Sequence, residues 1–211
     1  MPMIPRVTLL EKLYGGYIFD LDGTLVDSMP THFRAWRWAL RKNGAPADIF
    51  EWDEFNAHGG MFAVDIVAKL NRDYGLNMCP ETVADEKRRC YCELLESEPL
   101  PIIPETVELV RRLREQGIPY AIGTGSMILG AQETLRSAGL DGWFPIMVTP
   151  GDVPPGRGKP NPDIFLLCAE RMGVKPEECI VFEDAFPGIR AAAAAGMACC
   201  VVGPCPPQPA C

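Results

Sequence analysis

The sequence lacks several features by which common classes of protein are identified. It has no run of lysine and arginine residues long enough to form a basic patch, and its formal net charge is -8 at pH 7. The phosphates of nucleic acid repel a chain of this charge, so we expect no nucleic-acid partner. It also has no apolar stretch long enough to span a membrane, and we expect no membrane partner.

The amino-terminal segment MPMIPRVTLL is apolar but short. Glu11 and Lys12 interrupt it before it reaches the length of a signal peptide. We therefore expect a soluble, cytoplasmic protein. At the other end, the segment GPCPPQPAC contains too much proline to pack regularly, and we expect it to be a loose end.

The cysteines show no spacing that is typical of a metal site. The chain has nine of them but no Cys-x-x-Cys pair, and it has only two histidines. A zinc site needs several such ligands close together. We therefore favour buried or idle thiols over a zinc site.

Apolar periodicity predicts strands that alternate with helices along most of the chain. Strands are expected at about 17–19, 118–123, 145–149, 179–183 and 198–202. Helices are expected at about 32–42, 61–72, 82–97, 128–138, 162–172 and 189–195, and one more ends at Gly117. This alternation is typical of a parallel, doubly wound, Rossmann-like sheet in an α/β protein.

One block of the chain departs from this alternation. Residues 30–99 contain helical patterns but no strand pattern, and the proline-rich segment EPLPIIPE at 98–105 suits a stiff return crossing. We therefore predict two domains. An α/β core is formed by residues 1–29 and 100–211, and a helical cap formed by residues 30–99 is inserted into it.

Polar side chains follow the predicted strands where each strand ends. These residues are Asp20, Asp22, Thr124, Ser126, Lys159 (after a loop), Glu183 and Asp184. In open α/β sheets, ligands bind beyond the carboxyl ends of the strands. We therefore expect these side chains to meet in one crevice.

The carboxylates of this group favour a metal site. Asp20, Asp22, Glu183 and Asp184 cannot all ionise at one place at low cost unless a cation lies among them, and oxygen ligands of this kind favour Mg²⁺. Together with Lys159 and Thr124, the ion would neutralise a transferring phosphoryl group. One aspartate would attack phosphorus to form an aspartyl phosphate, and the other would protonate the leaving oxygen.

Four motifs carry a resemblance to a known family. FDLDGTLVDS resembles the first signature of the haloacid dehalogenase superfamily, and GTGS, GRGKPNPDIF and VFEDAFPGI resemble its next three signatures in the same order. PTHFRAW, FLLCAERMGV and CIVFEDAFPGIRAAAAAGM are similar to the β-phosphoglucomutase-like branch, and within it to bacterial fructose-1-phosphate phosphatases. The resemblance covers nearly the whole chain.

The resemblance implies a role for each core residue. Asp20 would be the nucleophile and a metal ligand, and Asp22 the general acid and base whose backbone carbonyl also binds the metal. Asp184 would complete the ligands, with Glu183 close by. Thr124 and Lys159 would hold the phosphoryl oxygens, with Gly125 and Ser126 lining the same loop.

The resemblance also implies two substrate-binding residues near the cap. His32 stands where the branch has a hinge histidine, and Lys87, followed by Tyr91, matches a cap lysine. Ordinary structural roles compete with these assignments. His32 can cap a helix or lie on the surface, Lys87 stands in the charged run DEKRR, and Thr124 and Ser126 can cap the following helix.

A phosphatase and a phosphomutase are the two enzymes that the resemblance allows. The stretch HGGMFAVDIVAKLN has no arginine where the mutases keep one, and Met127 and Ile128 stand where mutases have polar or basic phosphate contacts. Arg72, Arg88 or Arg89 can reach the cleft from another helix. We favour a Mg²⁺-dependent phosphatase of small phosphate esters such as sugar phosphates, and a β-phosphoglucomutase-type mutase is the alternative.

A third hypothesis is a module that binds phosphate esters without turnover, or a phosphoacceptor of the response-regulator type. A response-regulator receiver lacks the Asp-x-Asp-Gly-Thr arrangement and the large cap. Because both a nucleophile and a proton donor are present, turnover is favoured. The resemblance further implies a monomer.

Overall fold

The computed structural model describes residues 13–203, so the first twelve residues and the chain from position 204 onward lie outside the described part. Five strands form one sheet in the order β3-β2-β1-β4-β5, and every pair is parallel. They are β1 (Gly16–Phe19), β2 (Tyr120–Gly123), β3 (Met147–Val148), β4 (Cys179–Glu183) and β5 (Ala198–Val201). The predicted doubly wound parallel sheet is confirmed.

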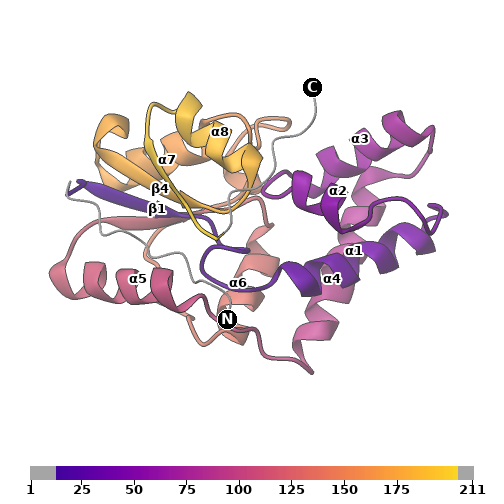
Figure 1. Cartoon of the computed structure of the whole chain (residues 1–211), viewed down its shortest axis with the longest axis horizontal. Coiled ribbons are helices and arrows are strands. Elements are labelled where there is room, and N and C mark those ends of the chain that lie inside the picture. Colours follow the sequence, from indigo (N-terminus) through magenta and orange to yellow (C-terminus); the bar gives the residue numbers. More distant parts are fainter. Residues whose placement is uncertain (1–12, 204–211) are drawn as a thin grey trace.

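Helices cover both faces of this sheet (Figure 1). On one face lie α5 (Pro104–Gln116) and α6 (Ile128–Ser137), and on the other lie α7 (Asp163–Met172) and α8 (Phe186–Ala194). Two 3₁₀ turns, η1 (Pro150–Asp152) and η2 (Pro176–Glu178), precede α7 and β4. No helix within residues 13–203 is both long and apolar enough to cross a membrane.

The central strand is buried on both faces, and its side chains alternate between two apolar clusters. Tyr17 and Phe19 belong to the cluster that includes Val110 of α5, whereas Ile18 packs in the cluster that includes Phe165 of α7. A strand buried on both faces consists of continuous apolar residues, because neither face meets water. This explains why the strand could be recognised from so short a run.

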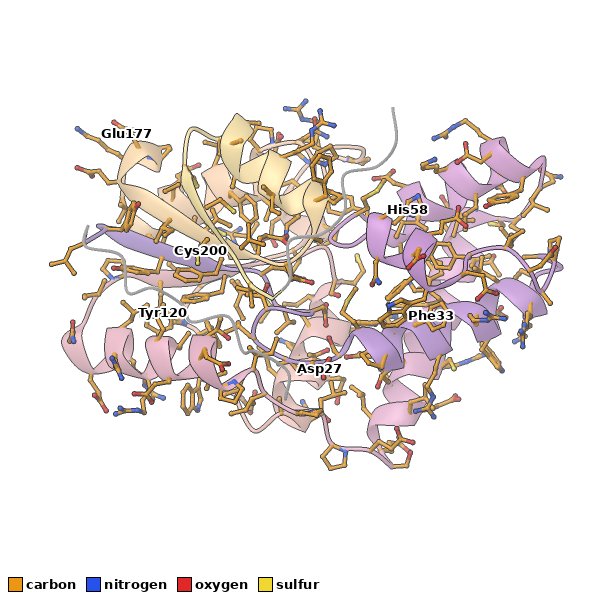
Figure 2. The ribbon with its side chains drawn as sticks, in the orientation of Figure 1. Asp27, Phe33, His58, Tyr120, Glu177 and Cys200 are labelled. Carbon is orange, nitrogen blue, oxygen red and sulfur yellow. The ribbon has the colours of Figure 1, made fainter. Side chains whose placement is uncertain are left out.

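Four helices lie together beside the sheet (Figure 1). They are α1 (Met29–Lys42), α2 (Trp52–Ala57), α3 (Ala63–Tyr74) and α4 (Pro80–Leu95). They share an apolar cluster of their own, which includes Trp36, Phe50 and Leu70. Phe33 lies among these helices, while Tyr120 and Cys200 lie between the sheet and its helices (Figure 2). We call α1 to α4 and the loops that join them the cap, and a separate cap domain bounded at 30–99 stays a prediction.

The two crossings between the sheet and these helices run side by side. Val26 forms an antiparallel bridge with Ile102, and the backbone N–H of Asp27 donates to the carbonyl of Pro101 at 2.9 Å. The segment at 98–105 is thus paired with the outgoing chain. This pairing holds both crossings at the edge of the sheet where β1 ends.

Helix starts were the least accurate part of the secondary-structure prediction. The helices α1 and α8 begin three residues earlier than expected, at Met29 and Phe186, and each has a proline in its first turn. Proline is tolerated there because the first N–H groups of a helix have no partner within the helix. The six-residue helix α2 was not predicted, since so short a segment shows no clear period.

Candidate active site

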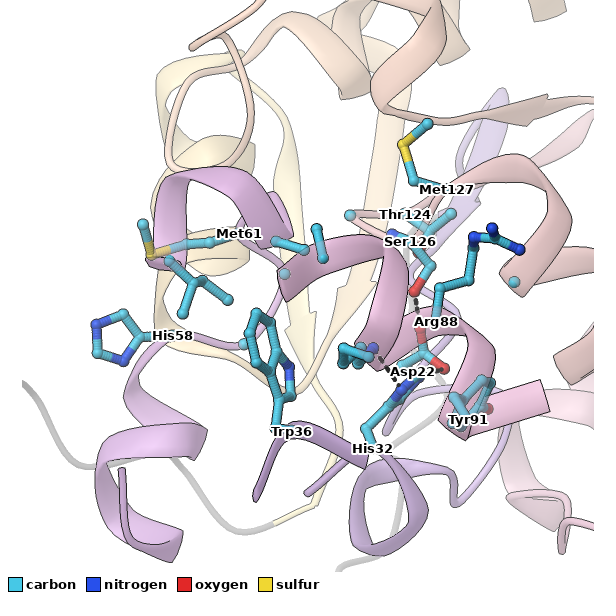
Figure 3. A pocket seen from close by; sticks show the side chains of 18 of the residues that line it. Asp22, His32, Trp36, His58, Met61, Arg88, Tyr91, Thr124, Ser126 and Met127 are labelled. Atoms are coloured by element: carbon cyan, nitrogen blue, oxygen red, sulfur yellow. Dashed lines mark hydrogen bonds and ion pairs between the residues drawn. The ribbon is translucent and has the colours of Figure 1, made fainter. Parts of the chain in front are cut away.

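The strand register brings the predicted residues to one edge of the sheet. Phe19 of β1 pairs with Ile122 of β2 and with Phe182 of β4, so the next residue of each strand stands at the same level. Asp20 and Glu183 are therefore neighbours. A cavity of about 320 Å³ opens here between the sheet edge and α1, α3, α4 and the start of α6 (Figure 3).

A buried ion pair forms the floor of the site. The Lys159 ammonium donates to Oδ1 of Asp20 at 2.6 Å and to Oε1 of Glu183 at 2.7 Å, and all three side chains are almost fully buried. Burial acts to lower the pKa of Lys159, but the two carboxylates outweigh it and raise the pKa above its usual range. Lys159 is therefore a buried cation in contact with Asp20, which lines the cavity.

The carboxylates around Lys159 carry more negative charge than one ammonium balances. Burial raises the pKa of Asp20 to about 7; Lys159 opposes this rise, and Glu183 and Asp22 add to it. Burial also raises the pKa of Asp184, as do the charges of Glu183 and Asp20. A second cation would relieve the repulsion between these carboxylates.

Carboxylate oxygens of Asp20, Glu183 and Asp184 lie within 4.8 Å of one another, which suits a small divalent ion. However, both oxygens of Glu183 already have donors, because Oε1 accepts from Lys159 and Oε2 accepts from the backbone N–H of Ala185 at 2.7 Å. Asp20 and Asp184 therefore fit as metal ligands better than Glu183 does. The contacts of Glu183 instead fix the position of Lys159.

Gly23 allows Asp184 to lie close to the first strand. Its φ of +89° is a conformation that side chains rarely adopt, and a Cβ at this position would lie 2.2 Å from Oδ2 of Asp184. The hydroxyl of Thr24 donates to Oδ1 of the same carboxylate at 2.9 Å. Gly23 and Thr24 thus position the carboxylate of Asp184, which follows the neighbouring strand β4 but lies far away in the sequence.

The carboxylate of Asp22 lies apart from the other three. It accepts hydrogen bonds from the hydroxyls of Ser28 and Ser126, both at 2.6 Å, and from Nε2 of His32 at 2.9 Å (Figure 3). Burial alone would raise the pKa of Asp22, but His32 and the two hydroxyls hold it below its usual range. We expected four carboxylates to converge, and three of them do so. The carboxylate of Asp22 is held away from them by donors of its own.

His32 and Lys87 form a chain that ends on Asp22. The Lys87 ammonium contacts Nδ1 of His32 at 2.8 Å, and an ammonium only donates, so Nδ1 accepts and Nε2 carries the proton given to Asp22. Burial, and then the charge of Lys87, lowers the pKa of His32, which stacks on Tyr91 at 3.8 Å between ring centroids. Burial also lowers the pKa of Lys87 to about 8.

These contacts exclude the surface alternatives for both residues. His32 is 6% exposed, and Lys87 donates inward rather than into solvent. Both side chains line the cavity, yet their hydrogen bonds join them to one another and to Asp22. The geometry therefore favours a positioning role for them over direct substrate binding.

The loop after β2 presents hydrogen-bond donors to the cavity. The hydroxyl oxygen of Thr124 accepts from the backbone N–H of Ser126 at 3.0 Å, so its own hydrogen remains available to a ligand. Neither residue caps α6, whose N-cap is Met127 without a side-chain hydrogen bond. The capping alternative for Thr124 and Ser126 is therefore wrong.

A glycine contact that the sequence analysis missed joins the cap to this loop. A Cβ on Gly125 would lie 2.4 Å from the carbonyl oxygen of Gly60, and a Cβ on Gly59 would lie 2.7 Å from Cβ of Ala185. The segment between α2 and α3 thus lies directly against the core loops. The only signal in the sequence was the Gly-Gly pair itself.

Two more functional contacts were missed, those of Thr24 and Ser28. Both residues stand within the motif FDLDGTLVDS, so the motif was a usable signal, but it does not show which residues they contact.

Of the three arginines considered, Arg88 lines the cavity, and Arg72 and Arg89 are not among the residues that line it. In Figure 3 its side chain runs past Ser126 toward Met127.

Comparisons with known proteins find relatives over most of the chain. The profile of haloacid dehalogenase-like hydrolases matches residues 14–196. The chain is 40% identical to fructose-1-phosphate phosphatase YqaB of Escherichia coli, over 89% of this chain and 96% of that protein. It is 36% identical to hexitol phosphatase A of the same organism, over 86% of this chain and 79% of that protein. A crystal structure of β-phosphoglucomutase from Clostridium difficile superposes with a TM-score of 0.78 at 26% identity, covering 91% of this chain and 86% of that one.

Proposed function

The chain belongs to the haloacid dehalogenase-like hydrolase family, and from this premise we propose that it is a Mg²⁺-dependent sugar-phosphate phosphatase whose nucleophile is Asp20. Phosphatases that cover most of the chain at 40% and 36% identity support hydrolysis of phosphoric monoesters. Their names, which specify fructose 1-phosphate and hexitols, support a phosphorylated carbohydrate. The observation that carries the mechanism is the placement of Asp20 against Lys159 with Asp22 held separately two residues away.

Asp20 is arranged to attack phosphorus. Among the described residues its Oδ1 accepts from Lys159, while no hydrogen bond to Oδ2 is present. Oδ2 would form the bond to phosphorus as the bond from phosphorus to the leaving oxygen breaks, which gives an aspartyl phosphate. Lys159 and the hydroxyl of Thr124 would stabilise the charge on the remaining phosphoryl oxygens.

The acidic cluster fits Mg²⁺ by its donor set and by its uncompensated charge. Asp20 and Asp184 would hold the ion, with the backbone carbonyl of Asp22 as a further ligand. When bound, Mg²⁺ would supply positive charge to the phosphoryl oxygens and to the carboxylates that repel one another. Thr24 and Gly23 would keep Asp184 in place for this purpose.

Asp22 would move the protons of both half-reactions. With three donors around it, the carboxylate stands in its proton-accepting form, which suits activation of the water that hydrolyses the aspartyl phosphate. In the first half-reaction it must carry a proton to the leaving oxygen. The negative charge of an arriving phosphate ester favours that protonation, because a like charge raises the pKa of a carboxyl group.

The test is release of inorganic phosphate from p-nitrophenyl phosphate in the presence of Mg²⁺. Asp20→Asn should abolish release, because an amide is not a nucleophile toward phosphorus. Asp27→Asn is a matched control, since Asp27 stands in the same motif but is exposed, and it should retain activity. Turnover by the Asp20→Asn variant at the wild-type rate would refute the proposal.

Phosphomutase activity is the second candidate, and Arg88 is the observation that favours it. A mutase needs a cation in the cap for a second phosphate, and Arg88 lines the cavity. Against this, Met127 and Ile128 place apolar side chains at the start of α6. With β-glucose 1-phosphate and a trace of the bisphosphate, a phosphatase releases phosphate, whereas a mutase forms glucose 6-phosphate without it.

We also propose a cytoplasmic location and a monomeric state. Seven cysteines of the described chain are free thiols, which suits a reducing compartment. Cell fractionation and the molar mass in solution would test these two points.

A further inference from the structure

One side of α4 forms a wall of the cavity. The residues of α4 that line the cavity recur at the spacing of one helix face and are Ala84, Asp85, Lys87, Arg88 and Tyr91. Lys87 and Tyr91 both contact His32 and therefore belong to the groups already described. Asp85 and Arg88 have no part in the proposed mechanism.

Asp85 and Arg88 form a loose ion pair on this wall. Nη2 of Arg88 lies 3.8 Å from Oδ1 of Asp85, which is longer than a hydrogen bond, and neither side chain makes a hydrogen bond to another residue of 13–203. The side chain of Arg88 is 38% exposed and that of Asp85 is 78% exposed. Because an exposed ion pair of this kind contributes little to stability, a ligand can bind to both groups at low cost.

The two groups of this pair are chemically complementary. The guanidinium of Arg88 only donates hydrogen bonds, and the carboxylate of Asp85 only accepts them. Since Asp85 opposes the charge of Arg88, the pair suits an uncharged ligand better than a second phosphate. Two adjacent hydroxyl groups of a sugar match it, because one hydroxyl oxygen can accept from the guanidinium while the next hydroxyl donates to the carboxylate.

The position of the pair suits the leaving group of a substrate. Asp20 lines the same cavity at the edge of the sheet, whereas Asp85 and Arg88 stand on the cap. The side chain of Arg88 runs beside Ser126 and points toward Met127, at the start of α6 (Figure 3). When the phosphate of a substrate lies at Asp20, its leaving group therefore occupies the part of the cavity that this face of α4 lines.

We infer that Asp85 and Arg88 are specificity-determining residues that bind a vicinal diol in the leaving group of the substrate. This inference rests on the proposed phosphatase activity and specifies its substrate class. The class is that of phosphate monoesters of sugars and polyols with two adjacent hydroxyl groups and no second phosphate. Each hydrogen bond to a charged group in such a partly exposed site is worth roughly tenfold in affinity.

The experiment measures kcat/KM for fructose 1-phosphate, which has adjacent hydroxyl groups, and for p-nitrophenyl phosphate, which has none. We expect Arg88→Ala and Asp85→Ala each to lower the ratio of the first value to the second roughly tenfold. Arg89→Ala and Glu93→Ala are matched controls and should keep the wild-type ratio. Arg89 and Glu93 form an exposed ion pair at 3.9 Å on the same helix, and neither residue lines the cavity.

The outcomes separate this inference from the proposed function. A wild-type ratio in either Arg88→Ala or Asp85→Ala would overturn the diol site and leave the phosphatase proposal intact. Wild-type turnover of p-nitrophenyl phosphate but not of fructose 1-phosphate would overturn the diol site as well. If the wild-type protein releases phosphate from neither ester, the proposed function itself fails.

Fructose 1,6-bisphosphate distinguishes a diol site from a second phosphate site. We expect the wild-type protein to have a higher kcat/KM for fructose 1-phosphate than for the bisphosphate, because Asp85 repels a second phosphate near Arg88. Asp85→Ala leaves the charge of Arg88 unopposed and should shift this preference toward the bisphosphate. A wild-type preference for the bisphosphate would overturn the inference and assign Arg88 to a second phosphate instead.

Discussion

Asp20 and Asp22 stand two residues apart at the end of the same strand, and their surroundings shift their pKa values in opposite directions. Asp20 has one donor, Lys159, and carboxylate neighbours, and its pKa is raised to about 7. Asp22 has three donors, and its pKa lies below the usual range. The same kind of side chain thus acquires two different pKa values from its neighbours, and in the proposed mechanism this difference would let one site provide both a nucleophile and a proton-transfer group.

The two sets of neighbours come from different parts of the fold. Asp20 is surrounded by residues of the sheet edge, namely Lys159, Glu183 and Asp184. Two of the donors to Asp22 are Ser28 and His32, at the start of α1, and Lys87 of α4 supports His32. The charged partners of Asp20 therefore come from the core, although Gly60 of the segment between α2 and α3 lies against Lys159. The environment of Asp22 depends also on the position of the cap helices.

Loss of Lys159 should give the largest effect, because among residues 13–203 it supplies the one ammonium in contact with Asp20. Lys159→Met would leave buried carboxylates without their cation, and we expect the free energy of unfolding to fall by about 3–5 kcal/mol. Denaturation in urea measures this. Lys175→Met, at an exposed lysine, should be close to wild type. The double variant Lys159→Met/Glu183→Gln should regain part of the lost free energy of unfolding. If Lys159→Met is as stable as wild type, the buried ion pairs of Lys159 do not stabilise the fold.

Asp22→Asn should reduce kcat by roughly two to four orders of magnitude, the usual contribution of a positioned acid or base. The amide keeps the shape of the side chain but cannot carry the proton. Steady-state kinetics at saturating substrate measures the loss. Ser28→Ala removes one donor of three and should have a smaller effect, so equal losses in the two variants would argue against proton transfer at Asp22.

The pH dependence of kcat tests whether Asp22 depends on the contact between His32 and Lys87. Burial lowers the pKa of Lys87 to about 8, so Lys87 is an ammonium below this pH and becomes neutral above it. We expect kcat to fall about tenfold as the pH rises through 8, because the charge that fixes the tautomer of His32 is lost. Lys87→Arg should move this fall to higher pH. Lys69→Arg, on the surface of the cap, should leave the profile unchanged.

The smallest effect should be seen in the melting temperature of the protein. Mg²⁺ should raise it by a few degrees, because ligand binding stabilises the folded state and relieves repulsion between Asp20 and Asp184. Asp184→Asn should abolish this rise, whereas Asp22→Asn should preserve it, since the carbonyl of Asp22 remains. Thermal unfolding with and without Mg²⁺ measures this. A rise of the same size in Asp184→Asn would place the ion elsewhere.

The core half of the site was more predictable than the cap half. The strand β4 was predicted at 179–183 and is found there, because an uninterrupted apolar run can be recognised without knowledge of its partners. In a parallel sheet all strands end at one edge, so the strand-end residues Asp20, Thr124 and Glu183 could be placed together. The role of Glu183 was less predictable, because it depends on Lys159 and the N–H of Ala185.

The cap contacts could not be read from the chain. His32 and Lys87 are 55 positions apart, and neither residue indicates that its partner is the other. The contact between Gly60 and Gly125 likewise depends on where the cap comes to rest against the core. Helical periodicity identifies which face of a helix is buried, but it does not specify which side chain of another helix lies opposite.

The sequence by itself determined the order of the strands and of the longer helices, and the edge of the sheet at which the acidic residues gather, because local apolar patterns and the geometry of parallel strands suffice for both. The tertiary structure decided which carboxylates lie together, which one is separated by its own donors, and which side chains wall the rest of the cavity. These depend on distances of a few ångströms between residues far apart in the chain, and packing alone sets those distances.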